Sequence, residues 1–177
     1  MHATGSLPNR ESGPPLHVVL YQPEIPQNTG NIGRTCVALG AKLWIVRPAG
    51  FRLDATQLKR AGLDYWQHLD WQAVDHWEQL VESLPGARFW FLTKFAERSY
   101  QSAAFERGDV LVFGRETSGL PDKLREEYAD RLLSIPMPGP VRSLNLATAA
   151  GIVMYAAAHK AGLLEVGEAS DAVGVEQ

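Results

Sequence analysis

Three loops rich in glycine, proline and polar residues hold the side chains of this chain that are best suited to ligand chemistry. They span residues 28–34, 114–121 and 135–146, and each follows apolar residues and precedes a helix-like stretch. Glycine lets backbone approach a ligand closely, and proline stiffens a loop. In α/β proteins such loops gather at the strand ends. We therefore expect all three to surround one pocket.

The first loop, Asn28-Thr29-Gly30-Asn31, has the composition of a helix N-terminal cap. A helix start offers free N–H groups to a phosphate or carboxylate, and Arg34 would lie about one turn inside that helix. The same residues also fit a plain cap with no ligand. A Walker loop is excluded because no Gly-Lys-Ser/Thr follows, and the glycine spacing excludes a dinucleotide fingerprint.

The second loop follows a very apolar run that ends at Phe113. Gly114 would let the backbone face a ligand, and Glu116, beside Arg115, suits a polar or cationic one. The alternative is a simple strand–turn–helix junction in which Ser118 or Asp122 caps the next helix.

The third loop is the most specific of the three. Prolines and a glycine between 136 and 140 predict a stiff bend that leads directly into a helix. Ser143 fits an N-cap. Asn145 would then lie just inside the helix, where asparagine is a poor residue. We therefore expect the Asn145 amide to have a specific partner.

Alternating strands and helices predict a mostly parallel sheet covered by helices on both faces. A helix of about 144–162 is rich in alanine, which favours either close packing against a partner element or simply high helix propensity. Apolar stripes predict further helices, one from Ile32 to Gly40 and one around 74–84. The predicted strands are 17–21, 42–46, 88–93, 109–113 and 131–135, with a weaker sixth near 68–71.

The 177 residues suit one domain over 16–164, with a flexible tail at 1–15 and a flexible acidic tail at 165–177. No apolar run is long enough to span a bilayer, and the N-terminal residues do not resemble a signal peptide. Cys36 is the only cysteine, so there is no disulfide framework. We expect a cytoplasmic protein without a membrane partner.

The net charge of −3 comes largely from the C-terminal tail, and the rest of the chain is nearly balanced. A local basic run could contact phosphates, or could be an ordinary solvated face. Its members are Lys42, Arg47, Arg52, Lys59 and Arg60. The five histidines are scattered without a metal-binding spacing, so we expect no metal.

Taken in order, the three loops resemble the signature of the SPOUT superfamily of RNA 2'-O-methyltransferases. The resemblance covers roughly 16–164 and is closest to short bacterial enzymes that modify the wobble nucleotide of leucine tRNAs. Residues 19–31 and 58–66 carry it nearly position for position. Arg115 and Ser118 vary the second loop, and Leu144 stands where methionine is common.

The resemblance implies an α/β fold with a C-terminal deep trefoil knot that holds S-adenosylmethionine, and a homodimer packed through the first and last helices. Arg34 would stand at the transferred methyl group, and Glu116 and Asn145 would organise the site. The cofactor pocket would be formed by Leu92, Gly114, Ile135, Met137, Ser143 and Leu144. The residues that would bind the RNA substrate are Lys94, Tyr155, Lys59 and Arg60, with Lys94 and Tyr155 also assisting at the site.

A sulfonium methyl group is already activated, so the protein must chiefly position the ribose oxygen and help with its proton. Arg34 is the family's candidate for the deprotonating group. A guanidinium normally stays charged, so stabilisation of the developing alkoxide or clamping of a phosphate are alternatives.

The implied function is 2'-O-methylation of cytidine or modified uridine 34 in leucine tRNAs. The runner-up is methylation of another tRNA or ribosomal RNA position. Two further alternatives are an RNA-binding knot protein without catalysis and a flavodoxin-like nucleotide binder.

Overall fold

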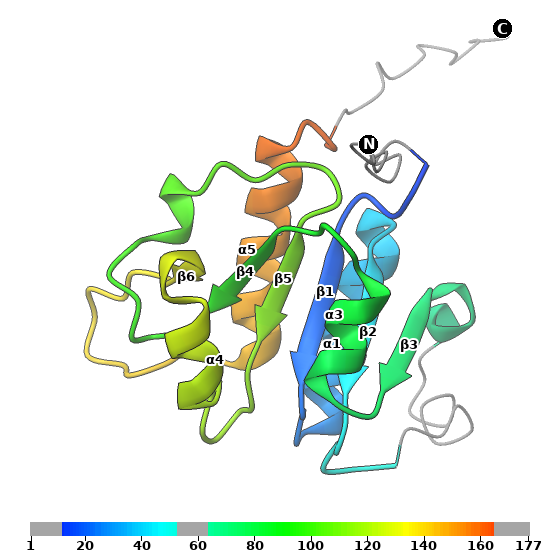
Figure 1. The fold of residues 1–177 in the computed structure, drawn as a ribbon, viewed down its shortest axis with the longest axis horizontal. Helices are drawn as coiled ribbons and strands as arrows, with labels where there is room; N and C mark the ends of the chain where they lie inside the picture. Colours follow the sequence, from blue (N-terminus) through cyan, green and yellow to red (C-terminus); the bar gives the residue numbers. More distant parts are fainter. Residues whose placement is uncertain (1–11, 53–63, 165–177) are drawn as a thin grey trace, which may run out of the picture.

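The structure, a computed structural model, describes residues 12–52 and 64–164. They contain one six-stranded sheet in the order β3-β2-β1-β5-β4-β6, and all of its strand pairs are parallel (Figure 1). The strands are β1 (His17–Tyr21), β2 (Lys42–Val46), β3 (Trp71–Val74), β4 (Phe89–Leu92), β5 (Val110–Phe113) and β6 (Leu132–Leu133).

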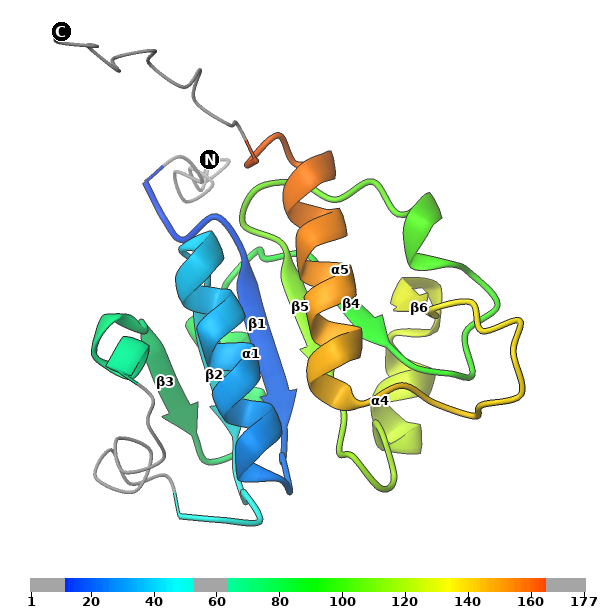
Figure 2. The ribbon, with the colours of Figure 1, turned by 180° about the vertical axis from the view of Figure 1, so that it is seen from behind.

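Helices cover both faces of this sheet, as the sequence predicts. Helices α1 (Pro26–Leu39) and α5 (Leu146–Lys160) lie side by side on one face (Figure 2). Helices α3 (Trp77–Ser83) and α4 (Asp122–Glu127) lie on the other (Figure 1). Short 3₁₀ helices are η1 (Asp64–His68), η2 (Tyr100–Ser102) and η3 (Ala129–Arg131).

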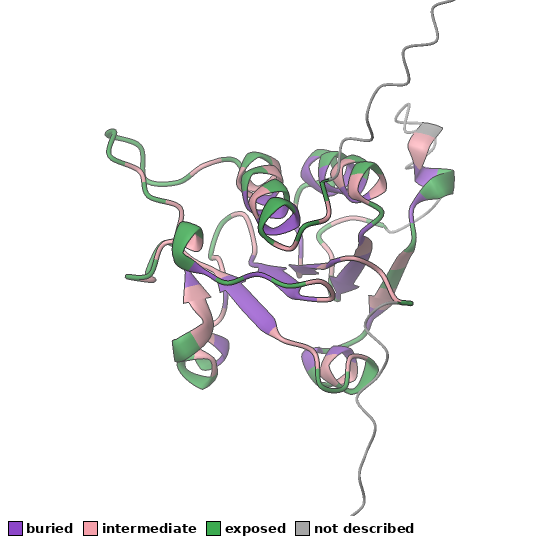
Figure 3. Ribbon diagram, turned by 90° about the horizontal axis from the view of Figure 1, so that it is seen from above, coloured by how far each residue is buried: buried purple, intermediate pink, exposed green. Residues whose placement is uncertain are grey.

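Alternation along the strands divides the core into two layers. In β2, Leu43 and Ile45 face α1 and α5, whereas Trp44 and Val46 face α3 and α4. Successive side chains of a strand point to opposite faces, so a strand buried on both sides reads as one continuous apolar run. Viewed from above, the central strands are buried between the helix layers (Figure 3).

Helix α1 begins earlier than the sequence predicts. Asn28-Thr29-Gly30-Asn31 is not a cap but lies inside the helix, which begins at Pro26. Proline suits the first helical turn because its fixed φ is already helical and its missing N–H would have no partner there. Arg34 therefore lies more than two turns into α1, not one.

Helix α5 has Asn145 as its N-cap, so the expectation that Asn145 lies inside the helix and Ser143 caps it is wrong. The Asn145 Oδ1 accepts hydrogen bonds from the N–H groups of Ala147 (2.9 Å) and Thr148 (3.3 Å). This satisfies two donors that the helix leaves free at its start. The buried small residues of α5, Ala150 and Ala157 among them, pack in the core with α1.

Two boundaries in the middle of the chain also differ from the prediction. The weaker strand predicted near 68–71 is β3, Trp71–Val74. It begins later than predicted because 64–68 forms the 3₁₀ helix η1. Val74 therefore belongs to β3, and the predicted 74–84 stripe is helical only over Trp77–Ser83. Neither Ser118 nor Asp122 caps α4, whose N-cap is Pro121.

Two members of the basic run, Lys42 and Arg47, lie apart and are each paired with an acidic residue. Lys42 opens β2 and Arg47 follows its last residue, so roughly 16 Å of extended chain separates them. Each has an acidic partner, Asp70 at 3.5 Å and Asp75 at 2.9 Å respectively. Lys59 and Arg60 lie outside the described residues.

His17 gives the fold a predictable response to acid. Its Nδ1 accepts a hydrogen bond from Trp44 Nε1 (3.0 Å), which requires an unprotonated Nδ1. Burial and, secondarily, the charge of Lys42 lower the pKa of His17 from 6.5 to about 4. The unfolded chain therefore binds this proton more readily, and stability falls as the pH drops from 6.5 towards 4.

We predict that His17→Gln removes this part of the pH dependence. Urea unfolding of both proteins at several pH values between 7.5 and 4 measures it. The free energy of unfolding should fall more steeply with acid in the wild type than in the variant. Equal slopes would contradict the assignment to His17.

Candidate active site

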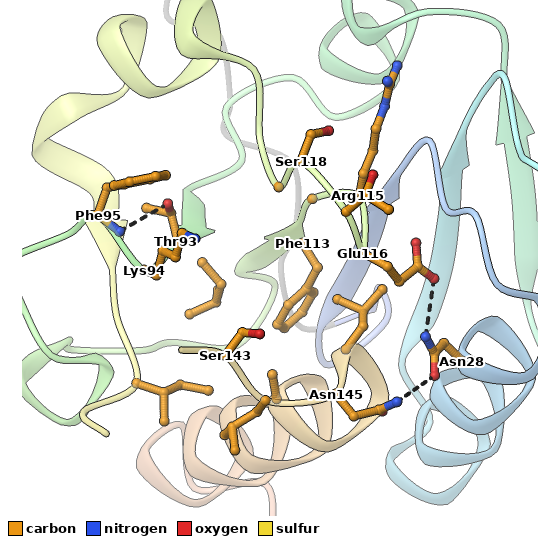
Figure 4. Close-up of a pocket in the computed structure, with 18 of the residues that line it drawn as sticks. Asn28, Thr93, Lys94, Phe95, Phe113, Arg115, Glu116, Ser118, Ser143 and Asn145 are labelled. Atoms are coloured by element: carbon orange, nitrogen blue, oxygen red, sulfur yellow. Dashed lines mark hydrogen bonds between the residues drawn. The ribbon is translucent and has the colours of Figure 1, made fainter. Parts of the chain in front are cut away.

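The three loops meet at the carboxyl edge of the sheet around a cavity of about 490 Å³ (Figure 4). Asn28 comes from α1, residues 114–119 follow β5, and residues 143–146 lead into α5. A fourth segment, 93–95 after β4, completes the wall. The expectation of one shared pocket is confirmed.

The Glu116 carboxylate joins the second loop to the start of α1. Its Oε2 accepts the N–H of Glu24 at 2.8 Å, and its Oε1 accepts the N–H of Ile25 at 3.1 Å. Oε1 also accepts Asn28 Nδ2 at 3.3 Å. Every partner is a donor, so a charged carboxylate fits this position and its negative charge favours the helix N-terminus.

Asn28, which is bound by Glu116, is also hydrogen-bonded to the third loop. Its Oδ1 accepts a hydrogen bond from Asn145 Nδ2 at 3.0 Å (Figure 4). The expectation of a specific partner for the Asn145 amide is thus confirmed. Because Asn145 Oδ1 also caps α5, one chain of hydrogen bonds fixes both helix starts and the second loop.

The Glu24 carboxylate, just before α1, makes a second set of hydrogen bonds to the second loop. Its carboxylate accepts the N–H of Thr117 (3.0 Å) and the Thr117 hydroxyl (2.9 Å). These hydrogen bonds hold the pKa of Glu24 below its usual range, with a smaller contribution from Arg115. Glu24 and Glu116 therefore bind each other's segments reciprocally. Each carboxylate accepts a backbone N–H at or next to the other residue.

Gly114 is required by the tightness of its own loop. A Cβ there would lie 2.2 Å from the carbonyl carbon of Gly119 and 2.4 Å from the nitrogen of Leu120. Residues 115 and 119 form an isolated antiparallel bridge, and Gly119 has a φ of +68°, which favours glycine. The proposed close approach to a ligand is therefore not the first reason for glycine here.

Most residues that the resemblance assigns to the site line this cavity. The polar ones are Lys94, Glu116, Ser143 and Asn145, and the Ser143 side chain points into the cavity (Figure 4). The others at the cavity wall are Leu92, Gly114, Ile135, Met137 and Leu144.

Arg34 and Tyr155 do not line it. Arg34 is exposed on α1, and its guanidinium carbon lies 5.1 Å from the centre of the Tyr65 ring. The Tyr65 hydroxyl donates to the Gly30 carbonyl at 2.5 Å, which fixes the ring against the same helix. Burial raises the pKa of Tyr65, and the charge of Arg34 opposes this. Tyr155 is 47% exposed on α5.

Sequence reasoning missed Asn28, Thr117 and Phe95 as individual site residues. Asn28 stood in a recognised motif, but its role was assigned to backbone capping. Thr117 is bound by a carboxylate 93 positions away, which no local pattern indicates. Phe95 had one signal, a position directly after an apolar strand.

In chemical terms the cavity combines apolar walls with a few polar groups, the usual composition of a small-molecule site. Leu92, Phe113 and Leu144 offer apolar surface to a flat ring, and Ser143 offers a hydroxyl. Within 12–52 and 64–164, no three His, Cys, Asp or Glu residues gather as metal ligands. No helix in those ranges has the length and apolar character needed to cross a membrane.

Comparison with known proteins assigns this chain to a family. A tRNA (cytidine(34)-2'-O)-methyltransferase of Methylovorus glucosotrophus is 45% identical over 141 residues, covering 79% of this chain and 92% of the relative. A solved structure concerned with 2-OH methylation of C/U34 on tRNA is 51% identical, with a TM-score of 0.77. The match covers 82% of this chain and 95% of the chain in that structure.

A third match is the SpoU methyltransferase AviRb of Streptomyces viridochromogenes in complex with AdoMet. It is 25% identical with a TM-score of 0.72, and the match covers 84% of this chain and 58% of AviRb. The SpoU rRNA Methylase family itself matches residues 15–155. The chain therefore belongs to the SpoU family of RNA methylases.

Proposed function

We propose that the protein uses S-adenosylmethionine to methylate the 2'-oxygen of the wobble nucleotide, cytidine or modified uridine 34, in leucine tRNAs. The observation that carries the proposal is the convergence of the three loops on one cavity, joined through Glu116, Asn28 and Asn145. Relatives at 45–51% identity are named for, or were studied for, methylation at position 34 of tRNA.

The cavity fits S-adenosylmethionine in its chemistry. The apolar walls suit the adenine ring, and the Ser143 hydroxyl suits the polar ends. The AdoMet complex of AviRb, a family member, supports the same cofactor here. Bound there, the cofactor would supply an activated methyl group.

This chain's own residues then have to orient the ribose and manage its proton. We assign Glu116 and Asn145 to holding the pocket in shape, because their oxygens and amide are already committed to the loops. Arg34 serves as the base, as a stabiliser of the developing alkoxide or as a clamp on the neighbouring phosphate. Lys94 and Tyr155 assist with the RNA, as do Lys59 and Arg60.

A homodimer through α1 and α5 accounts for the position of Arg34 outside its own cavity. The two helices lie side by side on one face (Figure 2). Ile152 and Tyr155 on α5 are 36% and 47% exposed, which gives this face apolar surface to bury. A twofold contact there would let Arg34 of one protomer serve the cavity of its partner.

We further propose a trefoil knot in the C-terminal part of a single domain over 16–164, flanked by flexible tails. The order of the sheet is compatible with it: β6 pairs at the outer edge, and the chain then returns as α5 to pack beside α1. The enzyme would work in the cytoplasm together with its tRNA substrate.

The function is tested by methyl transfer to leucine tRNA purified from cells that lack the protein. We expect one methyl group per tRNA, located at nucleotide 34 by mass spectrometry of nuclease fragments. A tRNA with 2'-deoxycytidine at position 34 should accept none. Methylation at another nucleotide would refute the assigned position, and no transfer would refute the proposed activity.

Arg34→Ala should lower the rate of transfer by about 10²–10³-fold while cofactor affinity and melting temperature stay near wild type, because a transition-state contact is lost. Arg34→Lys should recover only part of the rate, since an ammonium lacks the planar fork. Lys123→Ala, an exposed charge on α4, is the matched control. Normal turnover of Arg34→Ala would overturn the role of Arg34.

Mixed dimers test whether the site is shared between protomers. Arg34→Ala and Ser143→Trp should each be inactive, the second because a large ring fills the cavity. If Arg34 acts across the interface, an equilibrated one-to-one mixture should recover about a quarter of wild-type activity, because half of the dimers carry one intact site. A mixture no more active than its parents would show that each subunit works alone.

A further inference from the structure

Phe95 is an aromatic side chain exposed at the rim of the cavity. It is 60% exposed and lines the cavity in the 93–95 segment that follows β4 (Figure 4). The phenylalanine and tryptophan rings of the strands and helices around it are buried, Phe91 and Phe113 among them. The core therefore does not require a phenyl ring at position 95.

The ring is held in a cationic setting. The Arg125 guanidinium carbon lies 4.4 Å from the ring centre, within the range of a cation–π contact. Arg125 is itself anchored by an ion pair with Asp122 on the same helix. The Lys94 ammonium lies 5.3 Å from the ring centre and is exposed.

The backbone beneath the ring is also constrained. The N–H of Phe95 is bonded to Thr93 Oγ1 at 3.3 Å (Figure 4). Thr93 in turn donates its N–H to the Leu133 carbonyl of β6 at 2.9 Å. The ring is thus presented by a fixed strand end, so binding a flat partner would cost little ordering of this segment.

We propose that Phe95 is a stacking platform for a base of the RNA substrate that flanks the methylated nucleotide. This rests on the proposed function. An exposed aromatic ring combined with cations is the combination that binds single-stranded nucleic acid, since every base has a π-face and every linkage a phosphate. Lys94 and Arg115, both at the cavity wall, would meet the phosphates on either side.

The position of the ring favours a base of the RNA over the cofactor's adenine. At 60% exposure Phe95 faces outward at the rim, whereas the half-buried Leu92 and the buried Phe113 supply apolar wall inside. The cavity takes in the ribose to be methylated, so the neighbouring unpaired bases must lie outside it. The rim is where the first of them would arrive.

The test compares Phe95→Ala, Phe95→Leu and Phe95→Trp with wild type. Binding of a fluorescein-labelled anticodon stem–loop of leucine tRNA is measured by anisotropy, which needs no turnover, and methyl transfer is measured beside it. Loss of one base stack should raise Kd and KM about 5- to 100-fold in the alanine and leucine variants, with kcat little changed. Leucine is the matched control, because it keeps the apolar bulk without a π-face, and tryptophan should restore affinity.

Two further measurements separate stacking from other roles. S-adenosylmethionine affinity by calorimetry and the melting temperature should stay at wild-type values in all three variants. The salt dependence of RNA binding should keep its slope in Phe95→Ala but flatten in Lys94→Ala, which removes an ionic contact.

The proposal is overturned if Phe95→Ala binds the stem–loop like wild type, if Phe95→Leu does, or if cofactor affinity falls in parallel with RNA affinity. Failure of the proposed function looks different. The wild type would then transfer no methyl group to leucine tRNA, whatever the stem–loop affinities of the Phe95 variants.

Discussion

The candidate site depends on one carboxylate. Glu116 accepts two backbone N–H groups just before α1 and the amide of Asn28 within it, across more than 85 positions of sequence. Hydrogen bonds to a charged acceptor contribute about 1.5–3 kcal/mol each, roughly twice a neutral bond. Since Asn28 also holds Asn145, removing Glu116 would release the second loop and loosen the start of both α1 and α5.

This arrangement follows from the geometry of a parallel sheet. The carboxyl ends of all six strands lie at the same edge of the sheet. Segments that are far apart in the sequence therefore meet at this edge. The two apolar layers above and below the sheet fix the helices, and the hydrogen-bonded junction then sets the loops. Stability is supplied by the buried strands, whereas the shape of the cavity is supplied by a few polar contacts.

The sequence predicted the strands well and the junction poorly, for physical reasons. Strands 17–21 and 42–46 are continuous apolar runs, because both of their faces are buried. The start of α1 was misplaced because 28–31 was interpreted as a helix cap, and Asn145 was placed two positions too deep because Ser143 was interpreted as the N-cap of α5. Glu116 was assigned to the site, but its partners Glu24 and Ile25 are joined to it only by folding. The position of Arg34 outside the cavity was equally invisible to any local pattern.

The central claim, that the Glu116 junction assembles the cofactor pocket, is tested most directly by calorimetric titration of S-adenosylmethionine into Glu116→Gln. A glutamine must turn its NH₂ towards one of the donors that the carboxylate accepts, so the competent pocket becomes less populated and affinity should fall at least about tenfold. Glu126→Gln, an exposed carboxylate on α4, should bind like wild type. A Glu116→Gln protein that binds the cofactor with wild-type affinity would contradict the account.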